Sequence, residues 1–128
     1  MLVEIANDAD VAFAIATARE RAAEAGFDEA TRCMLATAAS ELARNILKYA
    51  GRGGLVVRLV REEGRRGVEI LAKDDGPGIP DVERALEDHY SSGGSLGLGL
   101  PGVRRMMDDF EVDSAPGRGT RVRARKWV

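Results

Sequence analysis

The sequence has little cysteine, histidine and aromatic side chain, and these scarcities exclude several classes of protein. Of its 128 residues, one is cysteine, one is histidine and 5% are aromatic. Cys33 alone forms no disulfide framework, and we expect it to be a small buried side chain in a reducing compartment. Since His89 is the only histidine, no cysteine and histidine cluster has the spacing of a structural zinc site.

The chain also lacks an excess of positive charge and a long apolar run. Its formal net charge is −2 at pH 7, so the basic footprint of a nucleic-acid-binding domain is missing. The basic run RVRARK at residues 121–126 alternates with apolar side chains, which favours the solvated face of a strand. The apolar stretch VAFAIATA at residues 11–18 is too short to span a bilayer, and the acidic residues before it do not fit a signal peptide. We therefore expect a cytoplasmic protein that binds neither nucleic acid nor membrane.

What is present is an ordinary globular composition, 45% hydrophobic and 31% charged. A chain of this length forms one core, and no repeat or linker divides it, so a single domain over residues 1–128 is expected. Two helical patterns occupy the first half. The first runs from an acidic cap, Asp8 or Asp10, to Gly26, and the second begins at Asp28 and ends at Gly51.

Strand patterns occupy residues 2–6 and much of the second half. Residues 55–60 and 67–73 flank a polar turn, which is typical of a hairpin. Early helices followed by strands predict a two-layer α+β sandwich, with one sheet and helices on one face. The other expected elements are a short helix over 81–90, a helix over 100–109 and a closing strand pair around residues 115–119.

The second helix carries a polar stripe suited to chemistry. Glu41, Asn45 and Lys48 fall at positions i, i+4 and i+7, on one narrow stripe. An apolar stripe is centred about a quarter-turn away, so the polar stripe is expected at the rim of the core. A carboxylate beside a carboxamide suits Mg²⁺ and a proton acceptor, although a solvated helix face would read similarly. The apolar stripe consists of Leu35, Ala38, Leu42, Ile46 and Tyr49.

Glycine-rich loops follow. SSGGSLGLGLPG, residues 91–102, holds five glycines before a helix, which requires either close backbone approach or a loop that moves. Its GLGLPG segment matches a dinucleotide-binding fingerprint in letters but lacks the strand and crossover that the fingerprint requires, and no P-loop motif occurs. Backbone amides of glycines that lead into a helix nevertheless favour phosphate binding. The strand before DDGPGI delivers Asp74, whose carboxylate can accept a hydrogen bond from an amino group such as that of adenine. PGRGT, residues 116–120, read alone is a hairpin loop.

In order along the chain, four motifs resemble the boxes of the Bergerat-fold (GHKL) ATPases. The motifs are ELARNILKYA at 41–50, DDGPG at 74–78, GSLGLGL at 94–100 and GRGT at 117–120. The chain is similar to the anti-sigma-factor serine/threonine kinases and, within them, to the RsbT-type switch kinases of the stressosome. The resemblance implies a two-layer α+β sandwich with a mixed sheet and helices on one face. It also implies ATP and Mg²⁺ as ligands.

The resemblance also implies residue roles. Asn45 would bind Mg²⁺, and Glu41 would act as the base toward a substrate hydroxyl or help organise the metal. Asp74 would take the adenine amino group. Lys48 would neutralise phosphate charge, or else be an outward solubilising lysine. The full nucleotide-binding set expected is Asn45, Lys48, Asp74, Gly76, Gly78, Gly94, Gly97, Leu98, Gly99 and Thr120.

By resemblance, the protein would phosphorylate Ser or Thr on a STAS-domain antagonist and then activate a PP2C-type phosphatase. The alternative is a nucleotide-binding anti-sigma factor that sequesters a sigma factor. A histidine-kinase catalytic domain is disfavoured, because no dimerising helix carries an acceptor histidine and His89 lies in the short lid between the glycine motifs. Both partners would dock beside the lid on Tyr90, Arg104 and Arg105, unless these arginines are ordinary surface charges.

Overall fold

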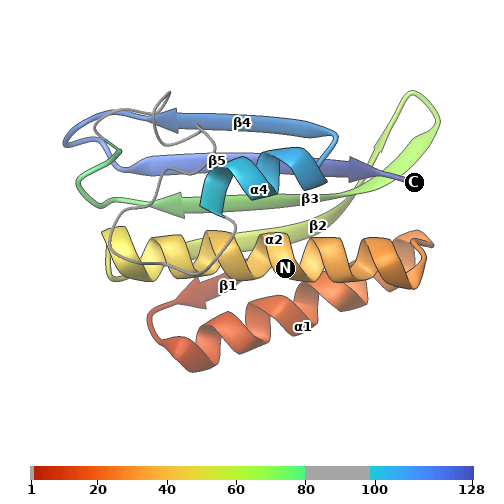
Figure 1. The fold of residues 1–128 in the computed structure, drawn as a ribbon, viewed down its shortest axis with the longest axis horizontal. Helices are drawn as coiled ribbons and strands as arrows, with labels where there is room; N and C mark the ends of the chain where they lie inside the picture. The colour runs from red at the N-terminus through yellow and green to blue at the C-terminus, as the bar shows by residue number, and fades with distance from the viewer. Residues whose placement is uncertain (1, 80–98) are drawn as a thin grey trace.

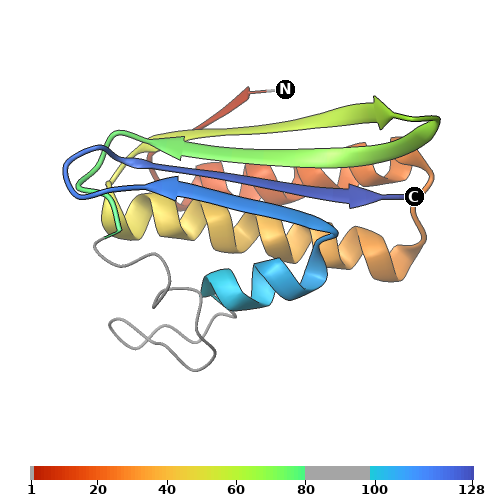
Figure 2. The same cartoon turned by 90° about the horizontal axis from the view of Figure 1, so that it is seen from above.

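The structure, a computed structural model, describes residues 2–79 and 99–128. One layer is a five-stranded sheet in the order β1-β2-β3-β5-β4, and the helices lie on one of its faces (Figures 1 and 2). This confirms the two-layer α+β architecture. The elements are β1 (Leu2–Ile5), α1 (Asp8–Ala25), α2 (Glu29–Tyr49), β2 (Gly53–Glu62), β3 (Arg65–Asp74), α4 (Gly99–Met106), β4 (Asp109–Ser114) and β5 (Thr120–Trp127).

The expectation of a mixed sheet is wrong for the strands described. All four pairings, β1 with β2, β2 with β3, β3 with β5 and β4 with β5, are antiparallel. β2–β3 and β4–β5 are each joined by a short turn, as in a hairpin, and such partners run in opposite directions. β4 runs in the same direction as β3, but β5 lies between them, so no parallel pair is in contact (Figure 1).

The caps of the two long helices differ from the expectation at one position. Asn7, rather than Asp8 or Asp10, caps α1: its side-chain oxygen accepts a hydrogen bond from the Asp10 amide at 3.0 Å. The Asp10 carboxylate in turn accepts from the Ala6 amide at 2.8 Å, one residue before the cap, which resembles a capping box shifted by one position. Asp28 caps α2 as predicted, accepting from the Thr31 amide at 2.9 Å.

The core lies between α1, α2 and the inner face of the sheet, where α2 buries Leu35, Leu42 and Ile46. Two expectations about α2 are wrong. Cys33 is exposed and donates to a Glu29 carboxylate oxygen at 3.5 Å, because it lies on the side of the helix away from Leu35. Tyr49, expected in the apolar stripe, is 41% exposed, since the helix ends there, beyond the sheet-covered part of the stripe.

The second half follows the predicted order. The hairpin is β2–β3, and the closing strands are β4 and β5. α4 ends at Met106, earlier than the predicted 109, because the Asp108 amide donates to the Arg125 carbonyl at 2.9 Å and so turns the chain toward the sheet. The helix expected over 81–90 lies outside the described residues.

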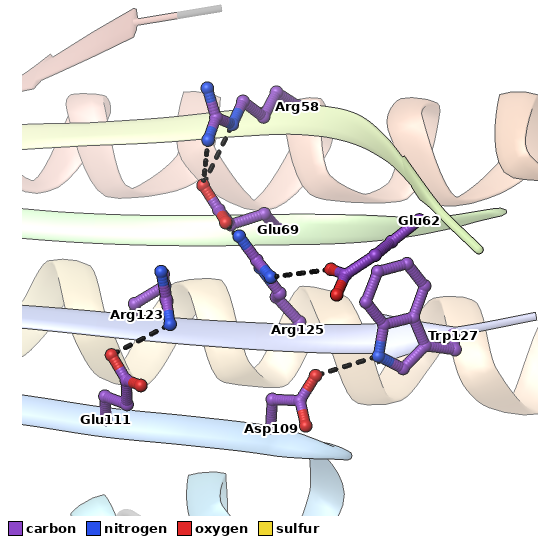
Figure 3. Close-up of polar contacts among 8 residues, drawn as sticks. All are labelled: Arg58, Glu62, Glu69, Asp109, Glu111, Arg123, Arg125 and Trp127. Atoms are coloured by element: carbon purple, nitrogen blue, oxygen red, sulfur yellow. Dashed lines mark hydrogen bonds and ion pairs between the residues drawn. The ribbon is translucent and has the colours of Figure 1, made fainter. Parts of the chain in front are cut away.

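The basic run of residues 121–126 lies on β5, and its arginines occupy the sheet face opposite the helices (Figure 3). This face is not simply solvated. Arg123 pairs with Glu111 at 2.9 Å, and Arg125 pairs with Glu69 at 2.6 Å. Glu69 is only 1% exposed, so the paired charges are partly removed from water.

Candidate active site

The polar stripe of α2 lies at the rim of the core, as its spacing predicts. Glu41 and Asn45 are half-buried, while Leu42 and Ile46 between and beside them are buried against the sheet. Lys48 is exposed, and its ammonium lies 5.2 Å from the centre of the Tyr49 ring. A carboxylate and a carboxamide oxygen are thus held one turn apart on a rigid helix, partly shielded from solvent.

Glu41 contacts the start of α4 directly. Its Oε2 accepts a hydrogen bond from the backbone amide of Gly99 at 3.2 Å, across 58 residues of sequence. Gly99 has φ +64°, a left-handed conformation that favours glycine. The first amides of a helix lack intrahelical partners and attract anions, so the carboxylate occupies a position that suits negative charge. One glycine of the predicted phosphate loop is therefore beside the predicted base.

Asp74 ends β3 near the carboxyl end of α2. Its Oδ1 accepts from the Gly76 amide at 2.9 Å, and its Oδ2 has no partner among the residues described. A Cβ at Gly76 would come within 2.6 Å of the Ala50 Cβ, so only glycine fits this packing. Ala50 follows α2, nine residues after Glu41, which is about 13 Å along a helix. Asp74 and Glu41 therefore lie at the two ends of the candidate site along α2.

A third segment joins the Asp74 end. Gly78 has φ +81°, and a Cβ there would be 2.1 Å from the Ala115 carbonyl oxygen. The Gly117 amide donates to the Pro77 carbonyl at 2.7 Å. The loop after β3 and the turn between β4 and β5, which are predicted as separate motifs, thus pack against each other.

Ser114, which sequence reasoning missed, connects these loops. Its hydroxyl oxygen lies 2.7 Å from the Ile79 amide, 3.0 Å from the Gly119 carbonyl and 2.9 Å from the Thr120 hydroxyl. A serine that ends a strand gives little signal in the sequence. The register of the strands β3, β5 and β4 would have pointed to it, because Ser114 pairs with Thr120 and Thr120 pairs with Asp74.

The remaining predicted residues divide into two groups. Arg104 and Arg105 are exposed near the end of α4. Tyr90, Gly94, Gly97 and Leu98, together with His89, lie outside the described residues.

Within residues 2–79 and 99–128, no group of three or more His, Cys, Asp or Glu side chains could hold a metal ion.

Comparison with known proteins identifies the family. The Histidine kinase-like ATPase domain matches residues 5–126. The chain is 44% identical over 126 residues to Serine/threonine-protein kinase RsbT of Bacillus subtilis (strain 168), covering 98% of this chain and 95% of that protein. The chain belongs to the RsbT-type serine/threonine kinases of the histidine kinase-like ATPase family. It is therefore a protein kinase with an ATPase fold, and ATP use follows from this membership.

Other relatives of this kinase chain are anti-sigma factors. It is 32% identical over 98 residues to the Anti-sigma F factor of Caldanaerobacter subterraneus subsp. tengcongensis, covering 72% of this chain and 67% of that protein. It is 38% identical over 95 residues to the Anti-sigma F factor of Clostridium beijerinckii, covering 70% of this chain and 66% of that protein.

Among solved structures, the mycobacterial sensor histidine kinase MprB aligns with a TM-score of 0.59 at 23% identity, covering 91% of this chain and 92% of that one. At this identity the likeness shows the fold alone. The helices described in this kinase chain include none that is long and apolar enough to cross a membrane.

Proposed function

We propose that this kinase transfers the γ-phosphoryl group of ATP to a serine or threonine of a STAS-domain antagonist and then activates a PP2C-type phosphatase. The observation that carries the proposal is the contact between Glu41 and the Gly99 amide. It brings a half-buried carboxylate to the helix start that suits a phosphate group, with Asn45 one turn away. In the proposal, residues 1–128 act as one cytoplasmic domain, and Lys48 neutralises phosphate charge.

Mg²⁺ fits the donor set. Mg²⁺ takes few protein oxygens and completes its coordination with water and phosphate, so the absence of an acidic cluster in the described segments is no obstacle. The Asn45 side-chain oxygen would hold the ion, and the ion would neutralise phosphate charge. The protein's own contribution is then positioning, as expected for phosphoryl transfer.

Glu41 would accept the proton of the acceptor hydroxyl. In this structure the same carboxylate accepts from Gly99, and one oxygen remains for another partner. A phosphate at the start of α4 would compete for the Gly99 amide, which would release both carboxylate oxygens for the substrate. At the other end, Asp74 would accept from the adenine amino group, with Gly76, Gly78 and Thr120 shaping the base site.

A second function has support from the relatives named Anti-sigma F factor. In that case the chain would hold nucleotide and sequester a sigma factor without needing phosphoryl transfer to a STAS protein. One observation separates the two functions: whether γ-phosphate from labelled ATP is recovered on a STAS protein encoded beside this one.

The test uses Glu41→Gln in that labelling assay. We expect the variant to fold and bind ATP while the transfer rate falls by about 10²–10⁴-fold, the usual scale of lost general-base help. Glu20→Gln, which changes an exposed carboxylate on α1, is the matched control and should transfer at the normal rate. An unchanged rate in Glu41→Gln would show that Glu41 only borders the site. No labelled STAS protein with the unaltered chain would favour the sequestering function.

A further inference from the structure

The hydrogen-bond partners of Ser114 restrict the neighbouring Thr120 hydroxyl. A serine hydroxyl has one hydrogen to donate and two lone pairs to accept. The Ile79 amide at 2.7 Å can only donate, so Ser114 accepts from it. The Gly119 carbonyl at 3.0 Å can only accept, so it takes the single Ser114 hydrogen.

The contact at 2.9 Å between the Ser114 and Thr120 hydroxyls then has one direction. Ser114 has no hydrogen left, so Thr120 must donate its own to the Ser114 oxygen. The reverse assignment would leave the Gly119 carbonyl without this bond, which carries a cost for a part-buried group. Thr120 therefore keeps only lone pairs for any further partner.

Thr120 and Asp74 face the same side of the sheet. They are cross-strand partners, and the residues two positions away on each strand, Val122 and Ala72, are buried under the helices. Asp74 offers its Oδ2, to which no described residue donates a hydrogen bond, and Thr120 offers its hydroxyl lone pairs. Two neighbouring acceptors, the Asp74 Oδ2 and the Thr120 hydroxyl oxygen, thus face the helix layer.

We propose that Ser114 is a specificity-determining residue, which holds Thr120 as an obligate acceptor so that the site selects a base bearing an amino group and rejects one bearing a carbonyl oxygen. The inference rests on the proposed function, in which the Asp74 end receives the base. Adenine presents an amino donor with two hydrogens, one for each acceptor. Hypoxanthine presents a carbonyl oxygen at the same position, and this oxygen would face two acceptors.

The test compares dissociation constants for ADP and inosine diphosphate by titration calorimetry, so that no turnover intervenes. We expect the unaltered protein to prefer ADP by about 10²-fold or more, because a site built around one hydrogen-bond pattern rejects its opposite strongly. In Ser114→Ala, Thr120 is free to rotate and donate to the carbonyl, and the preference should fall by about tenfold or more. Ser114→Thr keeps a hydroxyl and should keep the preference.

A purely structural role for Ser114 predicts a different result, in which Ser114→Ala weakens both nucleotides by the same factor and the preference is unchanged. That outcome would overturn the inference. If Ser114→Ala fails to fold, Thr120→Val decides, since removing the acceptor should weaken ADP and leave inosine diphosphate nearly unaffected. An unchanged preference in Thr120→Val would equally overturn it.

Asp74→Asn separates failure of this inference from failure of the proposed function. We expect Asp74→Asn to abolish ADP binding, because an amide does not replace a charged acceptor. If Asp74→Asn binds ADP within a factor of two of the unaltered protein, or if the unaltered protein binds neither nucleotide, the proposed base site is wrong and the inference falls with it. If Asp74→Asn loses ADP while Ser114→Ala keeps the preference, only the inference fails.

Discussion

At the scale of single residues, the two long helices begin with chemically different caps. Asn7 caps α1 with an amide, and Asp28 caps α2 with a carboxylate. Thr31 donates two hydrogen bonds to the Asp28 carboxylate, the more important from its backbone amide and the other from its hydroxyl. These bonds hold the pKa of Asp28 below its ordinary value. Because the Asp28 carboxylate titrates, the cap of α2 is sensitive to pH.

Asp28→Asn should weaken the dependence of the free energy of unfolding on pH at acidic pH. Because folding lowers the pKa of Asp28, its stabilising contribution is present above the pKa of the unfolded chain and is lost as pH falls through the folded pKa. We expect the free energy of unfolding to drop less between about pH 6 and about pH 3 in Asp28→Asn than in the unaltered protein, since asparagine caps without titrating. Urea denaturation at both pH values measures the difference. An identical drop would assign the acid sensitivity to other carboxylates.

The two helix caps show how far local sequence decides the role of a single residue. Asn7 caps α1 although Asp8 or Asp10 was expected, since each of these neighbouring polar side chains is of a type that caps helices. Asp28 starts its helix as predicted, because a cap bonds to amides within three residues. Cys33 was expected to be buried, but its exposure depends on which side of α2 meets the sheet. Ser114 was missed because its three partners come together only when two loops and a strand pair meet.

At the scale of elements, a row of charges crosses three strands on the open face of the sheet (Figure 3). Arg58, Glu69 and Arg125 are aligned by the strand register. Glu69 accepts from Arg58 at 2.9 Å and from Arg125 at 2.6 Å, and the bond to Glu69 raises the pKa of Arg125 further above its ordinary value. Arg125 also donates to Glu62 at 3.2 Å.

Glu69→Gln should destabilise the fold by about 2–3 kcal/mol, because it leaves the Arg125 guanidinium without its nearest charge partner. The cost falls below that of a fully buried pair, since the side chain of Arg58 is 57% exposed and reaches water. Glu111→Gln is the matched control on the same face: Glu111 is 67% exposed and pairs with Arg123 at 2.9 Å, so its loss should cost less than about 0.5 kcal/mol. Urea unfolding compares the two. Equal effects would mean that burial of Glu69 adds nothing to its pairing.

Element order and the two hairpins were predictable because they follow from local periodicity and turn residues. The end of α4 was not predictable from local sequence, since the hydrogen bond from the Asp108 amide to the Arg125 carbonyl joins segments distant in the sequence. The antiparallel arrangement also depends on a distant event, the insertion of β5 between β3 and β4.

At the scale of the whole molecule, α4 brings two exposed arginines to the side of the site. Gly99, at the start of α4, contacts Glu41, so Arg104 and Arg105 lie within two turns of the proposed phosphate end. An acceptor hydroxyl must come within about 3–3.5 Å of the γ-phosphate. In the proposed function, a protein substrate would therefore dock on this side. A phosphatase that uses the same surface would be excluded while the antagonist is bound.

Arg105→Glu should therefore weaken binding of the STAS antagonist and of the PP2C-type phosphatase together, by about tenfold or more, with ATP affinity unchanged. Calorimetry with each partner measures this. Arg61→Glu, which reverses an exposed charge on β2, is the control and should bind both partners normally. Normal binding of both partners by Arg105→Glu would locate the shared surface elsewhere.

Local sequence was enough to predict the helices α1, α2 and α4, the hairpins, the α2 cap, the polar stripe of Glu41 and Asn45, and the family. Each of these depends on residues close together in the chain or on motifs read in order. The contact of Glu41 with Gly99, the packing of Gly76 on Ala50 and the hydrogen bonds of Ser114 became visible only in the folded chain. These contacts join segments up to 58 residues apart. The physical reason is that such partners are chosen by sheet register and by how the helices lie on the sheet, which no local pattern encodes.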